Sequence, residues 1–307
     1  MQELWCEKYR PNDVASYVFG NADQKEKVEA WIKSGTIPHL LLSGGPGTGK
    51  TSLAKMLVTQ LDVHAYDVLS INASRDNGVD HIRDKIEGFV QTMPFGKFKV
   101  VLLDEADYLS INAQAVLRGL METYAETSRF ILTCNYPHKI IPALHSRCQG
   151  FHFEKLDPTE FVTRVATVLI EENVEFDLDV LDSYVKATYP DLRKCLNTVQ
   201  PNSLNGKLNM PSSKEADSND YRLIMVDLFK QKRMREARQL LCSKARPEEM
   251  EELFSWMYNN LDMWSASPEG QDEAILIIRK ALVWHTQCGD AEVNLSACIT
   301  ELMTINN

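Results

Sequence analysis

The chain has 307 residues, of which 44% are hydrophobic, 25% charged and 8% aromatic. This composition is typical of a globular protein and excludes a collagen-like, low-complexity or disordered chain. The length predicts two or three domains, each large enough to bury a core. The net charge of −10 means that any contact with nucleic acid depends on a local basic surface.

The cysteine pattern and the hydropathy indicate a reducing compartment. The seven cysteines are scattered and include no Cys-x-x-Cys pair, which argues against a disulfide framework and against a structural zinc site. The first residues lack the basic start and apolar run of a signal peptide, and no apolar stretch reaches the ~18 residues of a membrane helix. We therefore expect a cytoplasmic or nuclear protein, or one of the host cytoplasm if it is viral, with no membrane partner.

Short apolar runs alternate with helical patterns in the first half of the chain. The runs that predict buried strands are His39–Ser43, Val68–Ile71, Val100–Leu103 and Arg129–Thr133. The helical patterns cover 21–33, 51–61, 79–91 and 112–124. Strands that alternate with helices predict a parallel sheet with helices on both faces.

After about residue 155 the strand signals stop and helical patterns continue. Helices are expected over about 158–172, 177–187 and 190–200, and again from 221 to 304. The stretch from Pro201 to Asp220 is rich in Asn, Ser and Pro and is typical of a linker. We predict an α/β domain over 1–153, a small helical domain over 154–205, a linker over 206–220 and a second helical domain over 221–307.

A glycine-rich turn between a predicted strand and a predicted helix has the residue types of a phosphate-binding loop. Residues Gly44–Thr51 match G-x-x-x-x-G-K-[ST]. Glycines let successive backbone N–H groups curl around phosphates, and the following helix directs its positive end toward them. Lys50 is placed to reach the β- and γ-phosphates, and the Thr51 hydroxyl to bind Mg²⁺. The residues expected to hold ATP here are Gly45, Pro46, Gly47, Thr48, Gly49, Lys50, Thr51 and Ser52.

Two further predicted strands end in polar residues that suit hydrolysis. Asp104 and Glu105 follow an apolar strand, where Asp104 is placed to bind Mg²⁺ and Glu105 to polarise the attacking water. Asn135 follows the next strand and can help to position that water. The four residues from Asp104 to Asp107 also spell the name of a helicase family, but the chain lacks the second nucleotide-binding half that such helicases need.

These motifs together resemble those of AAA+ ATPases, and three further stretches resemble one branch of them, the clamp loaders of DNA replication. Trp5–Pro11 is similar to the amino-terminal signature of replication factor C small subunits, and Asn72–Ser74 to the segment after their second strand. Ser146-Arg147-Cys148 matches their arginine-finger tripeptide. The resemblance covers residues 5 to about 200, and the ATPase subunit of tailed-phage clamp loaders is similar as well.

The resemblance implies roles for further residues. Arg147 would be a catalytic residue that acts in trans on the nucleotide of a neighbouring subunit. The other catalytic residues would be Lys50, Glu105 and Asn135. Arg193 would touch the γ-phosphate. The segment that would contact the adenine comprises Glu7, Lys8, Tyr9, Arg10 and Pro11, with Val18 closing the base pocket.

The resemblance also implies partners and a reaction cycle. They are a sliding clamp, primer–template DNA and other loader subunits in a pentameric hetero-oligomer. ATP binding would drive clamp opening and DNA binding, and DNA-triggered hydrolysis would release the closed clamp. Arg75 and Arg83 are candidate DNA contacts, whereas Lys85 and the basic run 230–246 are better explained as solvated charges or a subunit interface. The helical domains would form a lid and an oligomerisation collar, and the helix near 112–124 would contact the clamp.

Two alternatives remain open at this point. Another AAA+ motor, such as a branch-migration helicase or a helicase loader, would share the nucleotide site but would usually end in a winged helix. A scaffold that senses nucleotide without turnover would tend to lack one or more of Glu105, Asn135, Arg147 and Arg193, all of which are present.

Overall fold

The computed structural model of the chain describes residues 3–75, 78–203, 206–211, 221–231, 233–246, 249–285 and 287–305. The chain divides into two compact units, which are described separately below. One is Glu7–Glu160, and the other is Phe161–Asn307 together with Met1–Cys6. The short helix α1 (Trp5–Lys8) falls on the boundary between them.

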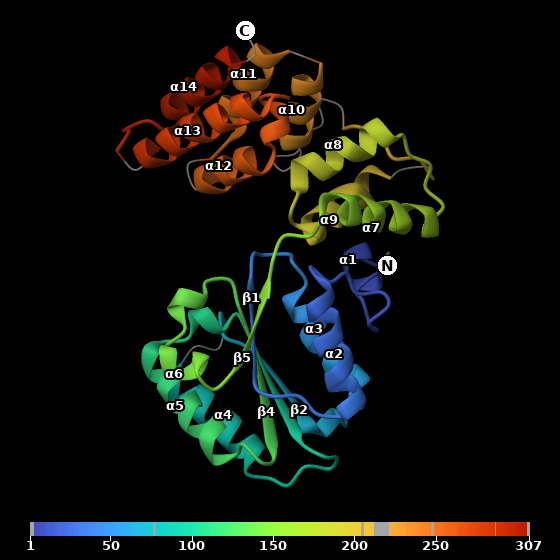
Figure 1. The fold of residues 1–307 in the computed structure, drawn as a ribbon, viewed down its shortest axis with the longest axis vertical. Helices are drawn as coiled ribbons and strands as arrows, with labels where there is room; N and C mark the ends of the chain where they lie inside the picture. Colours follow the sequence, from blue (N-terminus) through green and yellow to red (C-terminus); the bar gives the residue numbers. More distant parts are fainter. Residues whose placement is uncertain are drawn as a thin grey trace. The chain divides into compact units, whose positions relative to one another are not determined.

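The first unit is a parallel sheet covered by helices on both faces (Figure 1). Its strands are β1 (Leu40–Gly44), β2 (Val68–Asn72), β3 (Lys99–Asp104), β4 (Ser128–Cys134) and β5 (Gln149–Phe153), in the order β2-β3-β4-β1-β5. Every neighbouring pair is parallel. The carboxyl ends of all five strands therefore lie at one edge of the sheet, where ligands of such folds bind. The predicted fold class is confirmed.

Two hydrophobic cores lie on opposite faces of this sheet. The helices α2 (Ala22–Ser34) and α3 (Lys50–Gln60) cover one face, and α4 (Val79–Val90), α5 (Ile111–Thr123) and α6 (Pro142–His145) cover the other (Figure 1). Successive side chains of a strand point to opposite faces. Accordingly, Leu40 and Leu42 of β1 join the core under α2 and α3, and Leu41 joins the core under α4 and α5.

One strand was not predicted from the sequence. β5 pairs with β1 at the edge of the sheet, and Gly44 lies opposite Phe153 in their register. Phe151 and Phe153 are buried, whereas Gln149 and His152 are exposed. Burial on one side only gives an alternating pattern in place of a continuous apolar run, so β5 was not among the apolar runs that predicted strands.

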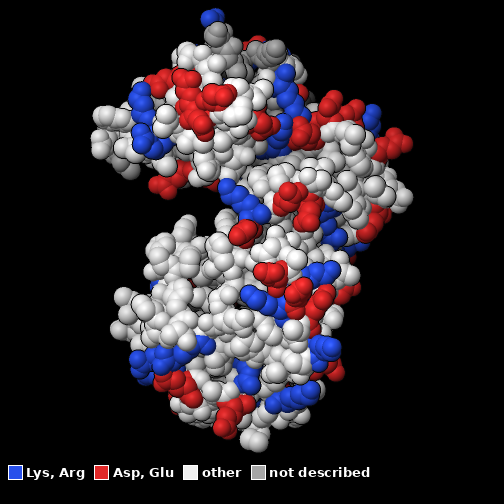
Figure 2. Space-filling view, in the orientation of Figure 1, with Lys and Arg blue, Asp and Glu red and all other residues white. Residues whose placement is uncertain are grey.

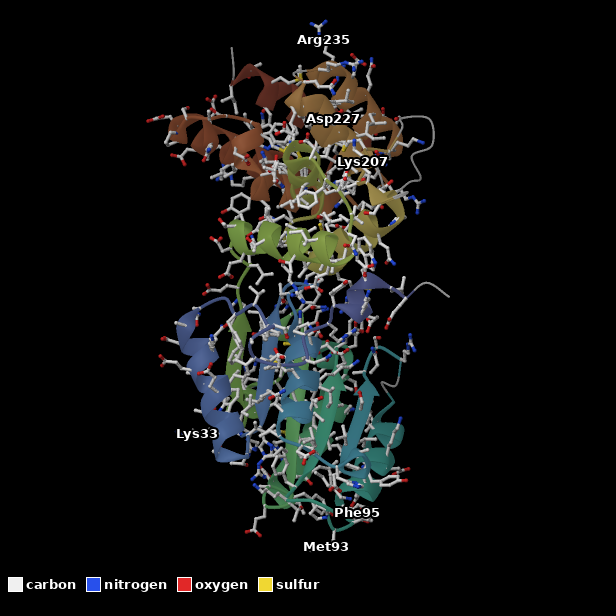
Figure 3. The ribbon with its side chains drawn as sticks, turned by 90° about the vertical axis from the view of Figure 1, so that its right-hand side faces the viewer. Lys33, Met93, Phe95, Lys207, Asp227 and Arg235 are labelled. Carbon is white, nitrogen blue, oxygen red and sulfur yellow. The ribbon has the colours of Figure 1, made fainter. Side chains whose placement is uncertain are left out.

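The edge of the sheet where the strands begin carries an exposed aromatic cluster. His64 and Tyr66 precede β2, and Met93 and Phe95 lie in the loop that leads to β3 (Figure 3). The rings of Tyr66 and Phe95 both lie near that of His64, with centroid distances of 5.5 and 5.3 Å. Met93 is 81% exposed. This apolar surface is at the opposite edge from the loop that follows β1.

The second unit is built from helices. It contains α7 (Pro158–Glu171), which begins before the boundary of the unit, α8 (Leu178–Thr188) and α9 (Leu192–Asn202), followed by α10 (Tyr221–Lys230), α11 (Met234–Lys244), α12 (Met250–Asn259), α13 (Pro268–His285) and α14 (Ala291–Thr304). All of these helices were expected from periodicity. None of the helices within the described ranges is both long and apolar enough to cross a membrane.

The segment predicted as a linker is described only in part, because 212–220 lie outside the described residues. Pro201 and Asn202 complete α9. Beyond them, Lys207 forms an isolated parallel bridge with Glu175, and Leu208 is buried. Residues 206–208 therefore pack within the folded helical unit.

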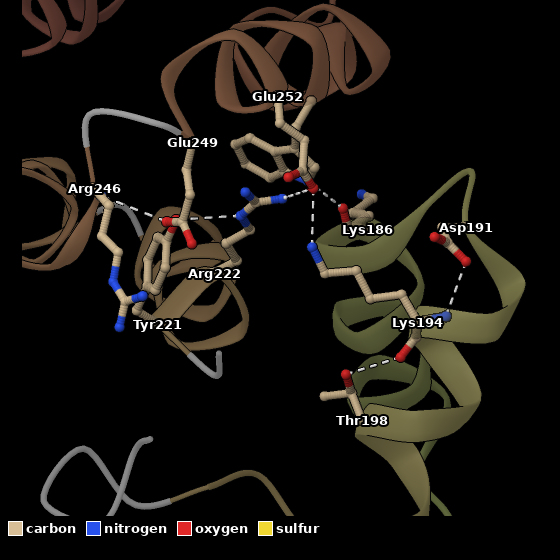
Figure 4. Close-up of polar contacts among 10 residues, drawn as sticks. Lys186, Asp191, Lys194, Thr198, Tyr221, Arg222, Arg246, Glu249 and Glu252 are labelled. Atoms are coloured by element: carbon tan, nitrogen blue, oxygen red, sulfur yellow. Dashed lines mark hydrogen bonds and ion pairs between the residues drawn. The ribbon is translucent and has the colours of Figure 1, made fainter. Parts of the chain in front are cut away.

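The helices α8 and α9 are joined to α10 and α12 by a polar network (Figure 4). One carboxylate oxygen of Glu252 on α12 accepts from Arg222 Nη1 at 2.8 Å and from Lys194 Nζ at 3.0 Å. The Trp256 indole also donates to the carbonyl of Lys186 at 2.7 Å. Arg222 is only 6% exposed. The network therefore contains a buried positive charge that is paired with the Glu252 carboxylate.

Candidate nucleotide site

The predicted phosphate loop connects the carboxyl end of β1 to the amino end of α3. Gly49 has a φ of 94°, and a Cβ at this position would lie 2.8 Å from the Tyr17 hydroxyl oxygen. A Cβ at Gly44 would lie 2.6 Å from the carbonyl oxygen of Phe153. Both positions therefore require glycine, and the loop lies close against its neighbours while α3 directs its free N–H groups toward it.

Lys50 is held inside this loop. Its Nζ donates to the carbonyl oxygens of Gly44 at 2.9 Å and of Gly45 at 2.6 Å, and the residue is only 8% exposed. The Thr48 hydroxyl donates to the same Gly45 carbonyl at 2.8 Å. The loop therefore surrounds a single buried ammonium group, which is the arrangement that attracts a phosphate.

Hydrogen bonds connect the loop directly to the ends of β3 and β4. The Thr51 hydroxyl donates to Asp104 Oδ1 at 2.7 Å, and the Thr133 hydroxyl donates to the same oxygen at 2.6 Å. The backbone N–H of Glu105 donates to Thr133 Oγ1 at 3.0 Å. The structure thus brings together Thr51, Asp104 and Glu105 as expected, and it adds Thr133, which sequence reasoning missed.

Glu105 has a backbone conformation that non-glycine residues rarely adopt. Its φ is 58° and its ψ 42°, in the left-handed region. Such a conformation costs about 1–3 kcal/mol and persists where surrounding contacts enforce it. Here the Thr133 hydroxyl holds the Glu105 N–H on one side, and the short helix η2 (Ala106–Tyr108) follows on the other. These contacts therefore fix the Glu105 backbone, from which the carboxylate side chain extends.

Asn135 follows β4 directly, and its loop is held by a carboxylate of η2. Asp107 Oδ2 accepts from the backbone N–H of Asn135 at 3.3 Å and of Tyr136 at 3.1 Å. Asp107 is 7% exposed. Asn135 therefore lies at the same edge of the sheet as Asp104 and Glu105, and Asp107 is a second contact that the sequence did not reveal.

Residues close to the predicted adenine-binding segment contact the phosphate loop and the helix that follows it, within the same unit. Tyr17 is buried and donates to the carbonyl of Gly49 at 3.3 Å. Gln60 at the end of α3 donates to the carbonyl of Asn12 at 3.1 Å. Burial raises the pKa of Tyr17 and so keeps its hydroxyl protonated. Val18 follows Tyr17 directly and is partly buried, whereas contact of residues 7–11 with a base stays a prediction.

The oxygen atoms at this edge fit a magnesium ion. Thr51 contributes a hydroxyl and Asp104 a carboxylate, and their 2.7 Å contact brings both to one point. Mg²⁺ prefers hard oxygen ligands and is usually bound through one or two carboxylates together with substrate phosphates. Among the described residues, Thr51 and Asp104 are the groups that would hold it.

The predicted arginines lie in different places. Arg147 follows α6 in the α/β unit, and its guanidinium forms an ion pair with Glu122 of α5. Arg193 lies in the first turn of α9 in the other unit, so its contact with nucleotide stays a prediction. Arg75 and Arg83 are exposed, and on the face drawn in Figure 2 acidic and basic side chains are intermixed.

Comparison with known proteins agrees with this geometry. Residues 40–155 match the family described as ATPase family associated with various cellular activities (AAA). The chain is 43% identical over 211 residues to the replication factor C small subunit of Sulfurisphaera tokodaii, covering 67% of this chain and 64% of that protein. It is 42% identical over 214 residues to the subunit of the same name from Sulfolobus acidocaldarius, covering 67% of this chain and 65% of that protein. The match thus spans a little less than two thirds of each relative.

The fold is also similar to that of solved AAA+ structures. The RuvB Holliday junction branch migration motor of Thermotoga maritima superposes with a TM-score of 0.54 at 16% identity, covering 76% of this chain and 85% of that one. At this identity the similarity concerns the fold alone. The fold, the loop after β1 and the matched domain define this chain as a member of the AAA+ class of P-loop proteins. Within that class, about two thirds of the chain is similar to the replication factor C small subunits.

Proposed function

We propose that this chain is the ATPase subunit of a DNA sliding-clamp loader, which binds ATP with Mg²⁺ and hydrolyses it to ADP and phosphate. The observation that carries the proposal is the set of hydrogen bonds from Thr51 through Asp104 and Thr133 to Glu105. It links the loop that would hold phosphates to the carboxylate that would act on water. The similarity to replication factor C small subunits supports the choice of a clamp loader among AAA+ proteins.

ATP would lie along the loop, with its phosphates against the backbone of Gly45–Gly49. Lys50 would exchange its carbonyl partners for the β- and γ-phosphates, because an ammonium bonds a charged oxygen more strongly than a neutral one. The helix α3 would add the partial positive charge of its amino end. Glu7–Pro11 and Val18 would contact the adenine.

Hydrolysis would depend on positioning and electrostatics. Glu105 would orient and polarise the attacking water, and Asn135 would help to hold that water in line with the γ-phosphate. A bound magnesium ion supplies charge stabilisation on the phosphate oxygens. Glu105 has a left-handed backbone, and its N–H donates to Thr133. Together these two features would set the direction in which the Glu105 side chain leaves the backbone.

The site would be completed by two arginines from outside the loop. Arg147 would approach the γ-phosphate of a neighbouring subunit and stabilise the charge that develops in the transition state. Arg193 would contact the γ-phosphate bound in its own chain, from the helical domain. An isolated chain would therefore be a poor ATPase, and assembly would be needed for turnover.

The partners would be a sliding clamp, primer–template DNA and further loader subunits in a pentamer. ATP binding would favour the state that opens the clamp and holds DNA, and hydrolysis would release the closed clamp. Arg75 and Arg83 would contribute DNA contacts only when several copies face one duplex, because the net charge of the chain is −10.

A branch-migration motor is supported less well. The likeness to RuvB is one of fold at 16% identity, whereas the clamp-loader subunits are more than 40% identical over two thirds of this chain. Beyond residue 160, the described part of the chain contains helices and one isolated bridge but no strand. The winged-helix end expected of such motors would require strands there.

Steady-state ATP hydrolysis by the assembled complex tests the proposal. The rate should rise when primed DNA and the cognate clamp are added together, and it should be lost in a complex built with Lys50→Ala chains. A rate that responds equally to a four-way junction and to primed DNA, without any effect of clamp, would favour a different DNA motor. Tight ATP binding with no turnover under any of these conditions would favour a nucleotide-sensing scaffold.

A further inference from the structure

The Arg147 guanidinium is held at several points by its own chain. Arg147 follows the short helix α6, and its Nη1 donates to the carbonyl oxygen of Ala143 at 2.8 Å and to the Ser146 hydroxyl at 3.3 Å. Its Nη2 forms an ion pair with the Glu122 carboxylate. The two terminal nitrogens of the guanidinium therefore bind different partners.

Glu122 comes from the last turn of a different helix, and that helix is fixed relative to α6. Met121 of α5 and Leu144 of α6 are both fully buried in the same core. Gln114 of α5 donates to the carbonyl of Lys139 at 3.1 Å and accepts from the N–H of Ile141 at 2.8 Å, just before α6. The Glu122 carboxylate is thus presented to Arg147 from a rigid support.

The contact leaves part of the guanidinium open to solvent. The Arg147 side chain is 33% exposed and the Glu122 side chain 48% exposed. A guanidinium carries five N–H donors, so a group held in this way can still bond a phosphate from outside the chain. An arginine side chain also has large rotamer freedom, and a carboxylate at a fixed place reduces it before the phosphate arrives.

We infer that Glu122 is a positioning residue for the trans-acting Arg147. It orients the guanidinium for the γ-phosphate of the neighbouring subunit and does not itself touch nucleotide. This inference rests on the proposed function, because it requires that Arg147 acts in trans. The alternative is that Glu122 restrains Arg147 and that the phosphate must break this ion pair. It is disfavoured because a partly exposed ion pair is weak, whereas a triphosphate carries several charges.

The test uses an assembled complex made from two kinds of chain. A Lys50→Ala chain supplies Arg147 but no working loop, and an Arg147→Ala chain supplies a loop but no arginine. Only sites formed between the two kinds can hydrolyse ATP. Placing Glu122→Gln in the Lys50→Ala chain should lower kcat about two- to fivefold, the range for one partly exposed ion pair, and leave KM unchanged.

Three controls separate positioning from a structural role. Glu122→Gln placed in the Arg147→Ala chain should change nothing, because that carboxylate has no guanidinium to orient. Glu126→Gln, which neutralises an exposed carboxylate in the turn after α5, should also change nothing in the Lys50→Ala chain. Glu122→Asp, which keeps the charge, should recover part of the lost kcat.

Each remaining outcome counts against the inference. An unchanged or increased kcat with Glu122→Gln in the Lys50→Ala chain would overturn it, as would an equal loss when the change is in either chain. A mixture that is inactive before Glu122 is changed would overturn the trans role of Arg147, and this inference with it. An active mixture that is insensitive to Glu122 would overturn this inference alone.

Discussion

Thr133 at the end of β4 and Asp104 at the end of β3 are joined by a 2.6 Å hydrogen bond from the threonine hydroxyl to carboxylate Oδ1. The same hydroxyl oxygen accepts from the N–H of Glu105. The Thr133 side chain thus holds the Asp104 carboxylate, which is expected to bind the metal. It also holds the backbone of Glu105, whose carboxylate is expected to act on the water. Thr133 is 1% exposed, so solvent cannot replace these bonds.

Thr133→Val should separate ATP binding from turnover. Valine keeps the shape but removes the Thr133 acceptor of the Glu105 N–H and one of the two hydroxyls that donate to Asp104 Oδ1. Such a change typically costs about 1–3 kcal/mol of stability. We expect kcat to fall about 10–100-fold, as when a residue that orients a metal ligand is removed.

The measurement is ATP affinity and single-turnover hydrolysis in the assembled complex. Affinity should change little, because no expected phosphate contact is removed. Thr59→Val, which removes an exposed hydroxyl near the end of α3, is the matched control. Equal losses in both variants, or a normal rate in Thr133→Val, would contradict the assigned role.

Lys50→Ala should weaken ATP binding strongly. The substitution removes the buried ammonium of the loop, and a charge-assisted hydrogen bond contributes about 1.5–3 kcal/mol, which corresponds to an affinity loss of about tenfold or more. Titration with a fluorescent ATP analogue measures it. Lys55→Ala, an exposed lysine on the same helix, should bind normally. Affinity within about twofold of the parent for Lys50→Ala would mean that the loop does not bind phosphate in this way.

The network at Glu252 predicts a pH-dependent stability of the helical unit. Burial favours the neutral form of Glu252, but hydrogen bonds and charges from Arg222 and Lys194 outweigh it and lower the pKa to about 2, from 4.5. A carboxyl whose pKa is lower in the folded state stabilises the fold above its unfolded pKa. This stabilisation is therefore present at neutral pH and is lost as the pH falls from about 4.5 towards 2.

Glu252→Gln should lower the free energy of unfolding at pH 7 by about 1 kcal/mol, a value kept small because the Glu252 side chain is 59% exposed. The difference from the parent should shrink as the pH falls towards 3. Urea denaturation of the full chain at several pH values measures it, with the neighbouring exposed Glu251→Gln as control. A difference that stays constant over this range would show that the charge of Glu252 contributes nothing to stability.

The strands and the loop could be predicted because their signals are local. Residues 44–51 form one continuous motif, the runs that became β1, β3 and β4 have buried side chains on both faces, and β2 is a short apolar run as well. β5 was missed because it lies at the edge of the sheet next to β1 and buries only alternate residues. Its signal, two phenylalanines separated by one polar residue, is too short to distinguish a strand from a turn.

The contacts that complete the site could not be predicted, because they depend on which strands are neighbours. Thr133 acts on Asp104 and Glu105 only because β3 and β4 are adjacent in the sheet. A polar residue at the end of a buried run was its only signal in the sequence. Likewise, Glu122 and Arg147 are 25 residues apart, and the packing of α5 against α6 brings them together.

The release of clamp by a Glu105→Gln complex tests the central claim most directly. The amide keeps the size of the side chain, and Thr51 and Asp104 are untouched, so ATP binding should survive. Hydrolysis should fall about 10²–10⁴-fold, since the charge that polarises water is lost. The measurement is the dissociation rate of labelled clamp from the loader after primed DNA is added. We predict a long-lived complex of loader, clamp and DNA. Clamp release at the parental rate by a complex whose ATPase is dead would contradict the account.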